Sequence, residues 1–278
     1  MSLNARVRRY VPSISRLTYI PWVKVVLDLF DVLPRLVFKE FRKLPPNHLR
    51  CRVGVRNRII ANQAHFLLHG RDQWLNAFDQ GWCHLDSDVV ELGVGCGRGA
   101  FHLRDTAFHG RTYTGTYLGV DIDDELLTWC RANFDERFEF AHSSHESVSY
   151  VNERSSGDYY RIPRDDATVD YIYGGSVFTH LLEDTIENYL TECARVLRPD
   201  RVMAMSCFFV DLPQGTLGDR HTFRHRVGDA HVESLAQPTA AVAYDTEFLF
   251  DLAKRCGFSE ASALYDPADA QHLLVCRT

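Results

Sequence analysis

A glycine-rich turn lies between a short apolar run and a helical stretch, and this arrangement limits the fold more than any other feature. The apolar run covers residues 89–92, the glycines alternate over 93–99, and a helix is predicted over 100–108. Alternate glycines let the backbone turn sharply and let a ligand approach, while free N–H groups at a helix start favour an anionic group. The segment therefore predicts a strand, a ligand-binding turn and a helix.

Further short apolar runs follow the turn and alternate with helical stretches or loops. They cover residues 117–121, 138–141, 169–173 and 202–210. This alternation is typical of an α/β protein with a parallel sheet and helices on both faces. The last two runs, 260–265 and 272–276, are joined by so short a connection that they must pair antiparallel.

The charge of the chain is unevenly distributed. The total of −6 divides into +10 over the first 60 residues and −16 over the remainder. This balance excludes a wholly basic nucleic-acid binder and marks the first segment as a separate layer. We expect a basic helical layer or lid over 1–57 and the main domain over 58–278, with a polar insertion at 211–243.

The N-terminal layer has an amphipathic pattern. Val23, Val26, Leu27 and Phe30 fall at helical spacing and predict a helix that ends before Pro34, followed by a shorter one up to Lys43. Two consecutive prolines, 45 and 46, are expected to close the layer. The apolar stripe, which includes Trp22, either packs on the domain or makes peripheral contact with a membrane.

Eight cysteines lie far apart, with no C-x-x-C pair and no spacing typical of zinc. This pattern predicts a reducing, cytoplasmic compartment. No secretory signal and no apolar run of 18 residues is found in the sequence. We therefore expect a soluble protein, or one that lies on a membrane surface.

The spacing of the glycines argues against a dinucleotide. A Gly-x-Gly-x-x-Gly fingerprint that begins at Gly93 needs glycine at position 98, where Arg98 stands. Glu91 precedes the turn, and a second run ends in Asp121, 28 residues after Gly93. The spacing of the glycines favours a nucleotide-like ligand other than NAD.

On these residues the chain resembles the class I S-adenosylmethionine-dependent methyltransferases, in particular bacterial members that act on small molecules. The resemblance runs from about Pro45 to the C-terminus and includes residues 170–181, 189–199 and 240–245. It implies a Rossmann-like, seven-stranded, mostly parallel sheet with an antiparallel last strand. It departs from the family where Ser144 replaces an expected acid near adenine and where Asp200 and Arg201 replace two glycines of a turn.

The resemblance also implies S-adenosylmethionine as cofactor and a set of cofactor-binding residues. Asp121 is expected to accept hydrogen bonds from both ribose hydroxyls. The expected contacts are Glu91, Gly93, Val94, Gly95, Gly97, Asp121, Ile122, Ser144, Gly175 and Ser176.

Two histidines are candidates for the base that removes the acceptor's proton. His180 follows the fourth predicted strand, at the edge where ligands bind open α/β sheets. The resemblance implies that the insertion at 211–243 covers the substrate. His225 lies in it, within a Thr-Phe-Arg-His pattern that matches the same subgroup. His180 serves equally well as a helix cap or an orienting group, and His225 as a solvated loop residue. Metal binding by His221, His225 and His231 is an alternative, although we expect no metal.

The sequence thus predicts an enzyme that transfers a methyl group to oxygen or nitrogen of a small metabolite, sugar or lipid-linked acceptor. The charge of −16 on the catalytic part argues against nucleic acid as the substrate. Two alternatives stay open. One is a non-catalytic cofactor-binding protein that docks on an anionic partner or membrane, and the other is an NAD-linked oxidoreductase.

Overall fold

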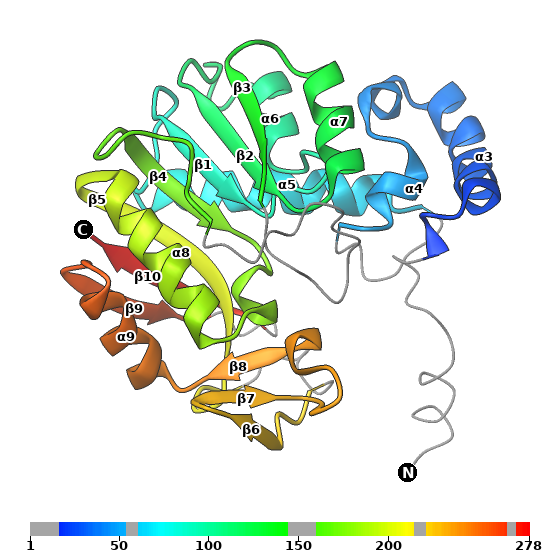
Figure 1. The fold of residues 1–278 in the computed structure, drawn as a ribbon. Coiled ribbons are helices and arrows are strands. Elements are labelled where there is room, and N and C mark those ends of the chain that lie inside the picture. Colours follow the sequence, from blue (N-terminus) through cyan, green and yellow to red (C-terminus); the bar gives the residue numbers. More distant parts are fainter. Residues whose placement is uncertain (1–16, 54–60, 144–159, 214–220, 266–270) are drawn as a thin grey trace.

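Five parallel strands form the centre of the molecule. The computed structural model describes residues 17–53, 61–143, 160–213, 221–265 and 271–278 (Figure 1). The strands are β1 (Val89–Leu92), β2 (Tyr117–Asp121), β3 (Phe138–His142), β4 (Val169–Gly174) and β5 (Leu197–Phe209). They lie in the order β3-β2-β1-β4-β5. The α/β fold predicted from the apolar runs is confirmed.

Helices cover both faces of these strands. Because side chains alternate along a strand, Val90 and Ile172 share one apolar cluster while Val89 and Tyr171 share another. The first cluster includes side chains of α8 (Glu183–Val196) and α9 (Thr246–Arg255). The second includes side chains of α5 (Gln63–Asp79), α6 (Ala100–Asp105) and α7 (Asp124–Asn133). Burial on both faces explains why the central strands are mostly apolar and do not alternate regularly with polar residues.

The C-terminal strands extend the sheet with reversed direction. β10 (His272–Arg277) pairs antiparallel with both β5 and β9 (Glu260–Leu264). This pairing confirms the antiparallel last strand expected from the short connection.

The predicted insertion contributes strands of its own. β6 (His225–Val227) and β7 (Ala230–Val232) pair antiparallel, β7 pairs with β8 (Val242–Tyr244), and β8 pairs in parallel with Phe208 and Phe209 at the end of β5. The expected count of seven strands is therefore corrected to ten within the described residues. Strands of three residues are too short to show the alternation by which strands are recognised in a sequence.

The N-terminal layer contains α3 (Pro21–Val37), the 3-10 helix η1 (Lys39–Lys43) and α4 (Asn47–Arg50). Contrary to the prediction, α3 continues through Pro34, and the Phe38 N–H donates to the Pro34 carbonyl at 2.8 Å. One proline removes a single donor, and the neighbouring bonds keep the helix together. Pro46 does not close the layer, because it precedes the first turn of α4. No helix in the described part of the chain is long and apolar enough to cross a membrane.

Candidate active site

A cavity of about 490 Å³ lies at the carboxyl ends of β1, β2 and β4. Ligands of open α/β sheets bind at this edge, where strand order reverses. Nine of the predicted site residues line the cavity: Glu91, Gly93, Val94, Gly95, Asp121, Ile122, Gly175, Ser176 and His180. The cavity therefore brings together the predicted cofactor residues and one of the two predicted bases. Ser144 lies outside the described residues.

The glycine turn forms the floor of this cavity. Gly93 and Gly95 have φ of +73° and +58°, a conformation that favours glycine. A Cβ atom added to Gly95 would lie 2.4 Å from Cγ1 of Val53, so the N-terminal layer packs directly on the turn. Gly97 does not line the cavity, and it packs instead against the ring of Phe134.

Asp121 connects the turn to the loop that follows β2. Its Oδ2 accepts a hydrogen bond from the Gly95 N–H at 2.7 Å, and its Oδ1 accepts one from the Asp123 N–H at 3.0 Å. Burial raises the pKa of Asp121 to about 6, although these backbone donors oppose the shift. Each carboxylate oxygen has two lone pairs, so the group keeps capacity for ribose hydroxyls.

Glu91 is the second buried carboxyl group of the cavity. It accepts hydrogen bonds from the Tyr117 hydroxyl and, at 3.4 Å, from the Gln73 amide. Burial raises the pKa of Glu91 to about 7, and the two hydrogen bonds oppose that shift. Two carboxyl groups with raised pKa suit a ligand that carries positive charge, because a nearby cation favours their ionised forms.

An unsatisfied hydroxyl also indicates a ligand. Thr179 lies on the 3-10 helix η2 (Phe178–His180), lines the cavity and is fully buried. Its Oγ1 has no hydrogen-bond partner within the described residues. Buried polar atoms normally have a partner, so a bound molecule with a donor or acceptor would complete this one. The glycine floor, the two carboxyl groups and this hydroxyl fit S-adenosylmethionine.

The structure separates the two candidate histidines. His180 Nδ1 lies 3.0 Å from the Thr239 carbonyl, which can only accept, so Nδ1 carries the proton and Nε2 is the basic nitrogen. Burial lowers the pKa of His180, while the carbonyls of Thr239 and Ala240 oppose the shift. His225 lies exposed on β6 and does not line the cavity.

Another histidine of the insertion, His221, does line the cavity. Its ring packs against Phe208 and Phe223, with centroids 5.2 and 5.3 Å away. Within the described residues no group of three or more His, Cys, Asp or Glu side chains is placed to hold a metal ion.

Several further residues of the cavity carry no sequence signal for their role. They come from segments far apart in the chain and include Val53, Ser143, Tyr189, Phe208 and Gln271. Gln271 Oε1 accepts hydrogen bonds from Ser176 Oγ at 2.9 Å and Ser206 Oγ at 2.8 Å, and so connects β10 to the loop after β4. Only the tertiary fold brings such residues together.

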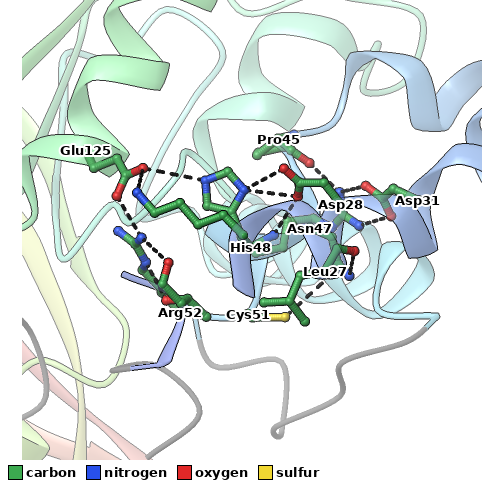
Figure 2. A network of polar contacts seen from close by, with 12 residues as sticks. Leu27, Asp28, Asp31, Pro45, Asn47, His48, Cys51, Arg52 and Glu125 are labelled. Atoms are coloured by element: carbon green, nitrogen blue, oxygen red, sulfur yellow. Dashed lines mark hydrogen bonds and ion pairs between the residues drawn. The ribbon is translucent and has the colours of Figure 1, made fainter. Parts of the chain in front are cut away.

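The N-terminal layer is attached beside the cofactor edge by ion pairs. Arg52 donates to Asp123 at 3.0 Å and to Glu125 at 2.7 Å, and Lys24 contacts Glu125 at 2.5 Å (Figure 2). Asp123 also caps α7 by accepting from two backbone N–H groups. The layer is therefore fixed to the segment that directly follows Asp121.

Comparison with known proteins identifies the central part of the chain. Residues 92–205 match the sequence model of a methyltransferase domain family. A probable S-adenosylmethionine-dependent methyltransferase of Mycolicibacterium smegmatis is 29% identical over 119 residues. That match covers 43% of this chain and 37% of the length of the relative.

Solved structures agree on the fold. A putative O-methyltransferase from Nostoc punctiforme superimposes with a TM-score of 0.51 at 14% identity, over 77% of this chain and 56% of that one. A protein from Pyrococcus horikoshii gives a TM-score of 0.50 at 17% identity, over 86% of this chain and 99% of that one. The sequence matches thus show a methyltransferase domain at residues 92–205, and the solved structures show its α/β fold.

Proposed function

We propose that the protein transfers a methyl group from S-adenosylmethionine to an oxygen or nitrogen atom of a small acceptor. The observation that supports this function best is a single cavity that contains the glycine turn, Asp121 and His180. The mycobacterial relative, a probable S-adenosylmethionine-dependent methyltransferase, supports the same activity and argues against the NAD-linked alternative.

The cofactor side of the cavity is assigned to the glycine turn and the two carboxyl groups. Asp121 would accept the ribose hydroxyls, and Gly93 and Gly95 would let the methionine part approach the backbone. Glu91 in its ionised form would balance positive charge on the ligand. S-adenosylmethionine, when bound, supplies a methyl group already activated by its sulfonium. The protein's remaining task is to position the acceptor and remove its proton.

The acceptor side is assigned to His180 and to the wall from β5 and the insertion. Phe208, His221 and Ala241 contribute to that wall. Nε2 of His180 would take the proton of the acceptor, because burial keeps this imidazole neutral near pH 7. We assign residues 211–243 to covering the acceptor and 58–278 to the catalytic domain.

The acceptor classes remain a metabolite, a sugar or a lipid-linked molecule, and the acidic charge of the domain disfavours nucleic acid. A cytoplasmic location also stays a prediction. It is supported by the eight cysteines, which are all free thiols, seven of them buried. A reducing compartment keeps thiols in this form.

The test combines binding and turnover. Calorimetry with S-adenosylmethionine and with NAD determines the cofactor, and methyl-labelled cofactor is then incubated with a panel of hydroxylated, aminated and lipid-linked acceptors. We expect label on at least one acceptor, with loss of transfer in His180→Ala. Tight cofactor binding without transfer to any acceptor would favour the non-catalytic alternative, and binding of NAD alone would contradict the proposal.

A further inference from the structure

Helix α3 turns its charged side toward the protein. Lys24, Asp28, Asp31 and Arg35 follow one another at helical spacing, and each has a polar partner on the same side of the helix. Figure 2 shows Asp28 and Asp31 turned toward these partners. Asp28 lies 2.8 Å from His48, and Asp31 lies 2.5 Å from the fully buried Arg50. Arg35 donates to the carbonyls of Leu44 and Pro45 at 2.9 and 2.7 Å. Polar contacts therefore hold this helix on the layer.

The opposite side of α3 is apolar and exposed. Five of its side chains are between 62% and 69% exposed: Trp22, Leu29, Leu33, Leu36 and Val37. Val25, Val26, Phe30, Val32 and the following Phe38 are exposed beside them. We call these ten side chains the apolar face of α3. An amphipathic helix of a soluble domain normally points such a face inward, and a continuous exposed patch of this kind marks an interaction surface.

The surrounding charges indicate what covers the apolar face. The sequence before Asp28 contains five arginine and lysine residues and no acidic one. Beyond the helix, Lys39, Arg42 and Lys43 are exposed, with Glu40 as the single acid among them. Both acids of α3 itself lie opposite the apolar face, where they pair with His48 and Arg50 of the layer. The segment is basic in sequence, and exposed basic side chains directly follow the apolar face, which carries Trp and Phe. This combination complements an anionic lipid surface.

The length and the position of α3 agree with contact to a lipid surface. A helix of 17 residues is about 25 Å long, and α3 lies at the outer edge of the molecule, away from the sheet (Figure 1). We propose that the apolar face of α3 docks the protein on an anionic membrane surface, with the helix parallel to the bilayer. This inference does not depend on methyl transfer, and vesicle binding without cofactor tests it separately.

The experiment is co-sedimentation of the full-length protein with vesicles of equal parts phosphatidylcholine and phosphatidylglycerol, and with vesicles of phosphatidylcholine alone. The double variant Leu29→Glu and Leu33→Glu places two charges on the apolar face. Leu235→Glu, at a leucine 59% exposed in the insertion, is the matched control. We expect binding to the anionic vesicles, with affinity reduced by about tenfold or more in the double variant and unchanged in the control.

A second measurement covers the case in which the double variant folds poorly. Trp22 fluorescence should shift to the blue when wild-type protein binds anionic vesicles, and Trp22→Phe should lose most of this shift while it still sediments with them. The proposal is overturned if wild-type protein does not bind, or if the double variant binds equally while circular dichroism shows it folded. It is also overturned if light scattering finds a dimer that dissociates in the double variant, since a second copy then covers the face.

Discussion

Replacing Glu91 by glutamine should make the protein more stable and at the same time weaken cofactor binding. The carboxyl group has a folded-state pKa of about 7 against an ordinary value of 4.5. Between pH 4.5 and pH 7, Glu91 keeps its proton in the folded state but releases it in the unfolded chain. The free energy of unfolding therefore falls as pH rises through this window, and the whole loss is present above pH 7.

The magnitude follows from the difference in pKa. A separation of about 2.5 pH units at 1.36 kcal/mol each corresponds to roughly 3 kcal/mol at pH 8 and about 1 kcal/mol at pH 5. Glutamine cannot ionise, and its amide oxygen still accepts from the Tyr117 hydroxyl. The free energy of unfolding of Glu91→Gln should therefore exceed that of wild type by these amounts. It is measured without cofactor, by urea unfolding followed through tryptophan fluorescence.

The same substitution removes a negative charge from the cofactor side of the cavity. Calorimetry should show S-adenosylmethionine binding weakened by about tenfold, in line with one lost charged contact. Glu260→Gln, on the exposed strand β9, controls for the loss of one charge. If the stability of Glu91→Gln relative to wild type is the same at pH 5 and pH 8, the carboxyl group is not destabilised by burial and the reasoning is refuted.

Three other substitutions test the remaining parts of the description. Asp121→Asn should weaken cofactor binding by roughly 1.5–3 kcal/mol in calorimetry, and an unchanged affinity would remove Asp121 from the ribose site. His180→Ala should lower turnover by about 100-fold or more with cofactor affinity retained, whereas His225→Ala should have no effect. The acid limb of the wild-type pH profile should lie below pH 6.5, because burial lowers the pKa of His180. Arg50→Leu removes the fully buried cation of Asp31 and, within the described residues, leaves only Arg35 paired with it, so urea unfolding should show a loss of about 1.5–3 kcal/mol. A loss below about 1 kcal/mol would contradict that role.

The sequence was sufficient for the cofactor half of the fold because its signals are local. Strands such as 117–121 are buried on both faces and read as uninterrupted apolar runs. Gly93 and Gly95 sit at positive φ in a turn between a strand and a helix, and Asp121 ends the next strand. Each of these signals lies within a few residues, so no knowledge of the tertiary fold is needed to find it.

The acceptor half could not be predicted in the same way. His221 reaches the cavity and His225 does not, because the β6–β7 hairpin fixes which side chains turn away. Val53 and Gln271 belong to distant segments that only the folded chain brings to the strand ends.

Helix α3 shows a different limit. Its periodicity predicted two faces correctly, but periodicity does not tell which face meets the protein. Buried partners such as Arg50, which pairs with Asp31, decide that orientation, and they lie in another element.

Strand β5 has a consequence for how this enzyme could diversify. Its earlier residues pair with β4 and β10, while Phe208 and Phe209 pair with β8 of the insertion. Under the function proposed above, the acceptor wall thus depends on the end of β5, whereas the cofactor side depends on β1, β2 and the glycine turn. On this proposal, substitutions within 211–243 change acceptor preference and leave the cofactor side unchanged. Chimeras that exchange residues 211–243 between related enzymes should accordingly keep their methyl donor and acquire the substrate range of the donated segment.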